Sequence, residues 1–118
     1  MIPTTEKFAI YTNQLNPRIV EQVRTFIISK YNANNDFNIF SDVIPVNAEP
    51  SYAVLSAYYL PFYNGILVFT SLEDYVLKQN EIVEGIVTYV ISDPQIAKGG
   101  LEQQTKFISV VDDKVIEL

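Results

Sequence analysis

The chain has no cysteine and no histidine, and each absence excludes a class of chemistry. Without cysteine it can form neither disulfides nor thiolate metal sites. Without histidine it lacks the commonest general base and the commonest transition-metal ligand. Zinc-hydrolase chemistry and Ser-His-Asp catalysis are therefore excluded within this chain. We expect it to hold no metal or cofactor and to have no enzyme activity on its own.

Basic residues are few, with eight against 14 acidic residues and a net charge of −6. Nucleic-acid binders usually carry clustered Lys and Arg, because phosphate contacts supply most of their affinity. Here Lys7, Arg18, Arg24 and Lys30 form the only loose group. We therefore expect neither nucleic acid nor an anionic membrane as a partner, while a nucleotide ligand stays open.

Long apolar runs are missing as well. None approaches the roughly 20 residues needed to span a bilayer, and the longest candidate, residues 82–91, is interrupted by Glu84 and Gly85. Residues 1–7 lack the basic and apolar regions of a signal peptide. The sequence thus predicts a cytoplasmic protein.

The residues that are present suit one domain over residues 1–118, since 48% of them are hydrophobic. Short β-rich runs alternate with helix-period segments along it. The runs that predict strands are residues 8–11, 37–40, 66–69, 85–91 and 107–111. Residues 43–46 are expected to continue the second strand as an edge, and residues 115–118 to pair with the last strand across an Asp112-Asp113 turn.

Sequence signals for the beginning and end of helices lie between these predicted strands. Asn16-Pro17 predicts a capped helix that runs to about residue 33. Ser71, with Asp74 three residues later, predicts a second helix, which ends at Asn80. Asp93-Pro94 predicts a third, which Gly99-Gly100 ends. Residues 52–62 are interpreted as a mixed segment with helix near residues 57–60.

Strands that alternate with helices, and that are apolar on both faces, favour a parallel sheet with crossover helices. The expected fold is α/β, a three-layer, open, mainly parallel sheet of about five strands with helices on both faces. Such a sheet is Rossmann-like.

In open α/β sheets, ligands bind at the carboxyl ends of the strands. Polar residues at four predicted strand ends form a candidate binding rim: Asn13, Asp42, Ser71 and Asp93. Ser71 and Asp93 also fit as helix caps, whereas Asp42 precedes no predicted helix. An acid at the end of a second strand can bind ribose hydroxyls in dinucleotide folds.

Diagnostic phosphate-binding motifs are absent. No G-x-G-x-x-G follows the first strand, and no G-x-x-x-x-G-K-[ST] occurs anywhere. The acidic pairs Glu73-Asp74 and Asp112-Asp113 are interpreted as first-turn charge and as a turn, not as acid/base pairs.

An aromatic segment is a candidate interface, because tyrosine is enriched where a ring is buried and its hydroxyl stays wet. Its members are Tyr52, Tyr58, Tyr59, Phe62 and Tyr63. If they are exposed, a homodimer patch is the favoured interpretation and a sugar-stacking surface the other. Ordinary core and rim packing is the alternative.

A family resemblance covers about the first 90 residues and rests on pattern. The matching segments are residues 7–13, 16–17, 40–42, 52–55, 64–65 and 67–73. In their order they resemble the amino-terminal half of Rossmann-like, glycosyltransferase-type proteins of large tailed phages. The resemblance implies this fold and an orphan or acceptor-type half, because such transferases hold the nucleotide-sugar donor mostly in a second domain.

Two hypotheses follow from the sequence. The first is a non-catalytic, self-associating, Rossmann-like accessory domain, derived from a phage. The second is a small nucleotide- or nucleotide-sugar-binding domain that uses the rim.

Overall fold

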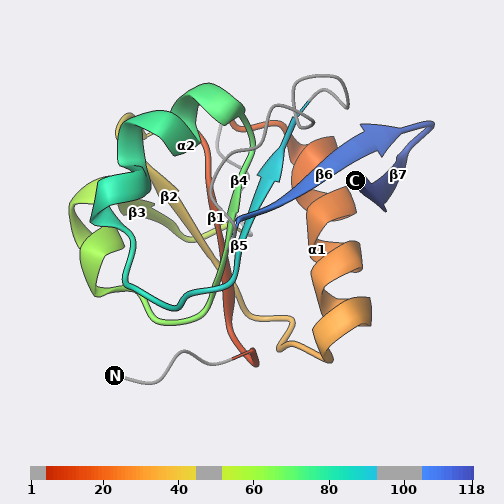
Figure 1. Ribbon diagram of the computed structural model, residues 1–118, viewed down its shortest axis with the longest axis horizontal. Helices are drawn as coiled ribbons and strands as arrows, with labels where there is room; N and C mark the ends of the chain where they lie inside the picture. Colours follow the sequence, from red (N-terminus) through yellow and green to blue (C-terminus); the bar gives the residue numbers. More distant parts are fainter. Residues whose placement is uncertain (1–4, 45–51, 93–104) are drawn as a thin grey trace.

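Seven strands form one mostly parallel sheet in the computed structural model, which describes residues 5–44, 52–92 and 105–118 (Figure 1). Their order across the sheet is β3-β2-β1-β4-β5-β6-β7, and only β6 and β7 pair antiparallel. The strands are β1 (Phe8–Tyr11), β2 (Asn38–Ser41), β3 (Val54–Ser56), β4 (Ile66–Phe69), β5 (Thr88–Ile91), β6 (Thr105–Val111) and β7 (Lys114–Glu117). The predicted α/β class and mainly parallel sheet are confirmed, but the sheet has seven strands, not about five.

The first helix, α1 (Pro17–Tyr31), begins where the sequence predicts it. The Asn16 side chain accepts hydrogen bonds from the backbone N–H groups of Arg18 and Ile19, which the first turn would otherwise leave unpaired. The helix ends at Asn32, which adopts a left-handed conformation with φ of 53°.

The segment between β2 and β4 combines strand and helix, as expected. The short strand β3 leads directly into the 3₁₀ helix η1 (Ala57–Phe62), which the Ser56 side chain caps by accepting the Tyr58 N–H. The expected edge extension of β2 is wrong for Val43 and Ile44, which lie outside the strand. The Ser41 hydroxyl accepts the Val43 N–H and so turns the chain there. Residues 45 and 46 lie outside the described residues.

The second half of the sheet follows the predicted turn signals. Ser71 accepts the Asp74 N–H and starts α2 (Leu72–Lys78), which continues into the 3₁₀ helix η2 (Gln79–Glu81). Asp112 and Asp113 both have positive φ, at 50° and 66°, as a two-residue hairpin turn requires. The helix expected from Asp93-Pro94 to Gly99-Gly100 lies outside the described residues.

Two hydrophobic cores lie on opposite faces of the sheet. Along β1, Phe8 and Ile10 pack with α1, whereas Ala9 and Tyr11 pack with η1 and α2. This alternation follows from the two-residue period of a strand, and it lets a fully buried strand serve both cores. Helices therefore cover both faces, α1 on one and α2 with η1 on the other (Figure 1). In the described part of the chain, no helix is both long and apolar enough to cross a membrane.

Candidate functional site

The carboxyl ends of the parallel strands lie along one edge of the sheet, at the top of Figure 1. The strand order changes direction at β1, because β2 and β3 are added on one side of it and β4 to β6 on the other. The loops that follow β1 and β4 therefore leave towards opposite faces of the sheet, one to α1 and the other to α2. Open α/β sheets bind ligands at such a point.

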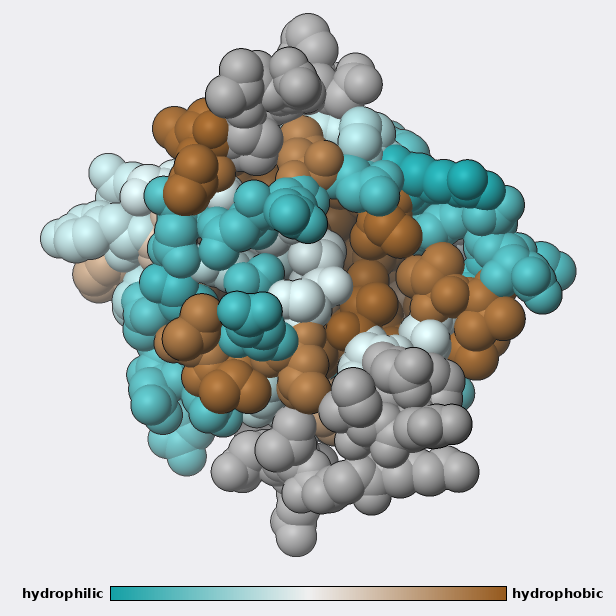
Figure 2. Space-filling model, turned by 90° about the horizontal axis from the view of Figure 1, so that it is seen from above, coloured by the Kyte–Doolittle hydropathy of each residue, from teal (hydrophilic) through white to brown (hydrophobic). Residues whose placement is uncertain are grey.

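A crevice of about 560 Å³ lies between these two loops, and we call it the β1/β4 crevice. Its volume falls within the range of small-molecule sites. Figure 2 looks down on this edge, where hydrophilic residues cover much of the left side and hydrophobic ones gather towards the β6–β7 hairpin on the right. The lining residues are Thr12, Asn13, Gln14, Asn16, Ile19, Val20, Thr70, Ser71, Glu73, Asp74, Leu77 and Ile91.

Asn13 joins three parts of this edge. Its Oδ1 accepts hydrogen bonds from the Asp42 backbone N–H at 2.9 Å and from the Ser41 hydroxyl at 3.1 Å. Its Nδ2 donates to the Tyr11 hydroxyl at 3.2 Å and to Asp74 Oδ1 at 3.4 Å. The side chain thus connects the end of β1 to the end of β2 and to the first turn of α2, and it fixes one wall of the crevice.

Asp42 lies beside the crevice rather than in its lining. Its carboxylate accepts a hydrogen bond from the Tyr11 hydroxyl and pairs with Lys78 Nζ at 3.0 Å. Partial burial acts to raise the pKa of Asp42, but the hydrogen bonds from Tyr11 and Lys78 outweigh it and hold this pKa below its usual value. The Asp42 contact also raises the pKa of Lys78. Burial, with the hydrogen bond to Asp42, raises the pKa of Tyr11.

This arrangement predicts how stability depends on pH. Because the folded state lowers the pKa of Asp42, its ionised form stabilises the fold above the unfolded-state pKa of about 3.9. That contribution is lost as the pH falls through the lower, folded-state value. We expect Asp42→Asn to lose about 1 kcal/mol of unfolding free energy at neutral pH, a value kept small because the carboxylate is 41% exposed.

Urea unfolding of the native chain and of Asp42→Asn across the acidic pH range would measure the difference between their unfolding free energies. It should shrink towards zero at low pH, where the native carboxylate becomes protonated. Asp36→Asn, which removes an exposed carboxylate away from this contact, is the matched control. A difference between Asp42→Asn and the native chain that stays constant with pH would contradict the assignment.

The structure therefore places some of the predicted rim residues close to one another at this edge of the sheet. Asn13 and Ser71 both line the crevice, and Asn13 contacts the backbone of Asp42 directly. Ser71 also caps α2, so its hydroxyl oxygen already accepts the Asp74 N–H. Asp93 lies outside the described residues.

Sequence reasoning missed several residues of this edge. The sequence predicts Tyr11 only as part of a strand, although its hydroxyl contacts Asp42 and Asn13. Lys78 lies 36 positions after its partner Asp42, and no local pattern connects the two. For Asp74 the sequence predicts only a role at the start of α2, in the cap and as first-turn charge, although it also accepts a hydrogen bond from Asn13. Only the polar character of the strand ends could have pointed to this edge.

The five residues of the aromatic segment do not share one surface. Tyr63 is buried, and Tyr52 packs against the core on the α1 face, where its hydroxyl donates to Glu21. Tyr58, Tyr59 and Phe62 are exposed together on η1. The segment therefore combines core packing with a smaller exposed surface.

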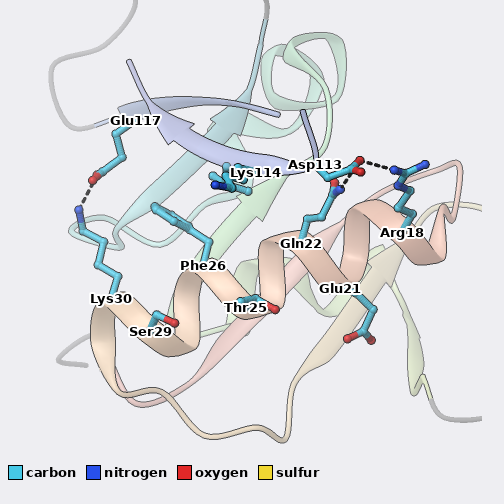
Figure 3. Close-up of a pocket in the computed structure, with 11 residues that line it drawn as sticks. Arg18, Glu21, Gln22, Thr25, Phe26, Ser29, Lys30, Asp113, Lys114 and Glu117 are labelled. Carbon is cyan, nitrogen blue, oxygen red and sulfur yellow. Dashed lines mark hydrogen bonds and ion pairs between the residues drawn. The ribbon is translucent and has the colours of Figure 1, made fainter. Parts of the chain in front are cut away.

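A larger groove, of about 790 Å³, lies between α1 and the β6–β7 hairpin (Figure 3). Ion pairs cross it near both ends, Arg18 with Asp113 and Lys30 with Glu117. Gln22 also donates to Asp113, at 3.2 Å. Because these polar groups already pair with one another, we interpret the groove as the contact of the hairpin with α1.

Comparison with protein-family models, with curated proteins and with solved structures finds no match for this chain. Within the described ranges, no group of three or more acidic side chains is placed to hold a metal ion. The crevice itself therefore supplies the argument about function.

Proposed function

We propose that this chain is a three-layer, Rossmann-like domain that binds a hydroxyl-rich small molecule, a sugar or nucleoside unit, in the β1/β4 crevice. The observation that carries the proposal is the position of the crevice at the change of strand order, between the loops that follow β1 and β4. The proposal concerns binding alone.

The chemistry of the lining favours hydroxyl groups as ligands. It combines amides, hydroxyls and carboxylates, which can both donate hydrogen bonds to sugar hydroxyls and accept them. Apolar side chains such as Ile19 and Leu77 offer contact to a sugar face or a base. Small-molecule sites commonly combine such apolar walls with a few polar groups.

The charge of the lining disfavours a phosphate inside the crevice. Glu73 and Asp74 line it, and among the described lining residues there is no Lys or Arg. A phosphate there would face two carboxylates with no basic side chain in the lining to balance them. In a nucleotide or nucleotide sugar, the neutral part would therefore occupy the crevice and the phosphates would point to solvent. A sugar-binding role also agrees with the resemblance to the amino-terminal half of glycosyltransferase-like proteins.

Thermal shift with uridine, UDP and UDP-glucose tests the proposal. Ligand at ten times its Kd stabilises the fold by about 1.4 kcal/mol, which raises the Tm by about 5 °C for a domain of this size. We expect uridine or UDP-glucose to raise the Tm, and UDP to do so no more than uridine. Repulsion by Glu73 and Asp74 is the physical reason for that order.

Glu73→Gln is the informative variant, because it removes a charge from the lining while the side chain stays exposed. It should change the Tm shift, and it should bring the UDP response closer to that of uridine. Glu84→Gln makes the same charge change at an exposed position outside the crevice and serves as the control. If all three probes leave the Tm unchanged, or if both variants respond alike, the crevice is not the site.

A further inference from the structure

The 3₁₀ helix η1 exposes three large aromatic side chains on one turn. Tyr58 is 75% exposed, Tyr59 54% and Phe62 71%. We call these three residues the aromatic surface. Ala57 and Leu60 of the same helix are buried in the core below. The helix is thus anchored through its small and aliphatic residues and presents its aromatic ones outward.

The geometry of η1 gathers these rings. A 3₁₀ helix has three residues per turn, so Tyr59 and Phe62 project from the same side. The Tyr58 ring packs edge-on against Tyr59, with the ring centroids 5.5 Å apart. Fully burying an aromatic side chain removes about 150–250 Å² from water, so leaving three in solvent forgoes a large stabilisation. Clustered exposure of this kind marks an interaction surface.

We propose that the aromatic surface is the interface with a second copy of this chain. The proposal is independent of the β1/β4 crevice, since none of the three residues lines it. A two-fold dimer brings the same patch of each copy against itself, so the patch must be compatible with its own charge and shape.

The distribution of charge along the chain is the argument for a second copy as the occupant. The chain carries a net charge of −6, so two copies repel each other over most orientations. From Pro50 to Leu72, however, the sequence contains no charged residue. The aromatic surface lies in this neutral stretch, so its own side chains bring no like charges together when two acidic copies meet there. Its two tyrosine hydroxyls can form hydrogen bonds across the interface or remain hydrated at its border.

Neighbouring residues extend the apolar character of this corner. Val43 and Ile44 are 66% and 65% exposed. They come after Ser41 and Asp42, and the register partner of Ser41 is Ser56, the residue directly before η1. The two exposed segments therefore start from adjacent strand ends, beside the sheet edge formed by β3.

Sedimentation velocity over micromolar to near-millimolar protein tests the proposal. The native chain should shift with concentration from a 13.4 kDa monomer towards twice that mass. The double variant Tyr58→Ser/Phe62→Ser should weaken association by roughly tenfold or more. Val111→Ser/Ile116→Ser removes exposed apolar groups from the β6–β7 hairpin at the other edge of the sheet, and it should leave association unchanged.

A second variant distinguishes a weaker interface from a folding defect. Phe62→Glu puts a negative charge on each copy at the contact, so its dimer should be weakest at low salt and recover partly as salt screens the repulsion. Circular dichroism and melting should show native folding in every variant, because the replaced side chains are exposed. A native chain that stays monomeric, or a control that weakens association as much as Tyr58→Ser/Phe62→Ser, would overturn the proposal. So would a monomer whose tyrosine fluorescence responds to an oligosaccharide such as maltohexaose, which would make the surface a carbohydrate platform instead.

Discussion

Replacing Phe69 by alanine should destabilise the fold by about 3–5 kcal/mol. Phe69 is fully buried at the end of β4. The centroid of its ring lies 5.3 Å from the ring centroid of Tyr11 and 5.5 Å from that of Tyr75. Alanine would leave a cavity directly below the loop that forms one wall of the β1/β4 crevice. Since domains of this size are stable by only about 5–15 kcal/mol, the loss is a large share of the total.

The same substitution at Phe62 provides the control. Phe62 is 71% exposed, so Phe62→Ala in the monomer should change stability by no more than about 0.5 kcal/mol. Urea unfolding of both variants at low protein concentration measures the contrast. Equal losses at the two positions would mean that the division of the aromatic residues between core and surface is wrong.

Asn13→Ala should cost about 2–3 kcal/mol, the second largest effect we expect. The change removes four hydrogen bonds at once and leaves the Asp42 N–H without its acceptor, while the Ser41 hydroxyl keeps its hydrogen bonds with the Val43 backbone. Each polar group left unpaired in a buried position costs about 1–3 kcal/mol, and partial access to water reduces the sum.

Asn13→Asp distinguishes the hydrogen bonds that the Asn13 side chain accepts from those that it donates. An aspartate keeps an oxygen for Ser41 and the Asp42 N–H, but it places a carboxylate where the amide nitrogen now donates to Asp74. Its stability relative to the native chain should therefore improve as the pH falls towards about 4, where carboxylates become protonated. Chemical unfolding at several pH values distinguishes the variants. If Asn13→Ala unfolds like the native chain, Asn13 does not hold the strand ends together.

The elements and their ends were largely predictable, because their signals are local. Asn16 caps the helix that starts one residue later, and Ser71 does the same for α2. The Asp112-Asp113 turn depends on two residues that tolerate positive φ. Each of these interactions joins residues only a few positions apart, so the sequence pattern contains both partners.

The number of strands was harder to predict from the sequence. The three-residue strand β3 lies in a nearly continuous apolar segment whose pattern suits strand and helix alike. Its pairing with β2 decides between them, and that pairing is an interaction with another part of the chain. The expected edge extension through Val43 failed because the Ser41 hydroxyl takes the N–H that a ladder would have used.

The sequence by itself determined an α/β domain without cysteine or histidine, and it identified polar residues at the strand ends as the place to look for a site. Only the tertiary structure decided which of them meet. Asn13 contacts Asp42 across 29 positions and Asp74 across 61, because the sheet order places β1 between β2 and β4. The same packing ties Asp42 to Lys78, buries Tyr63 and leaves Tyr58 in solvent. Such outcomes depend on which surfaces come together over long separations, and no local pattern of residues contains that information.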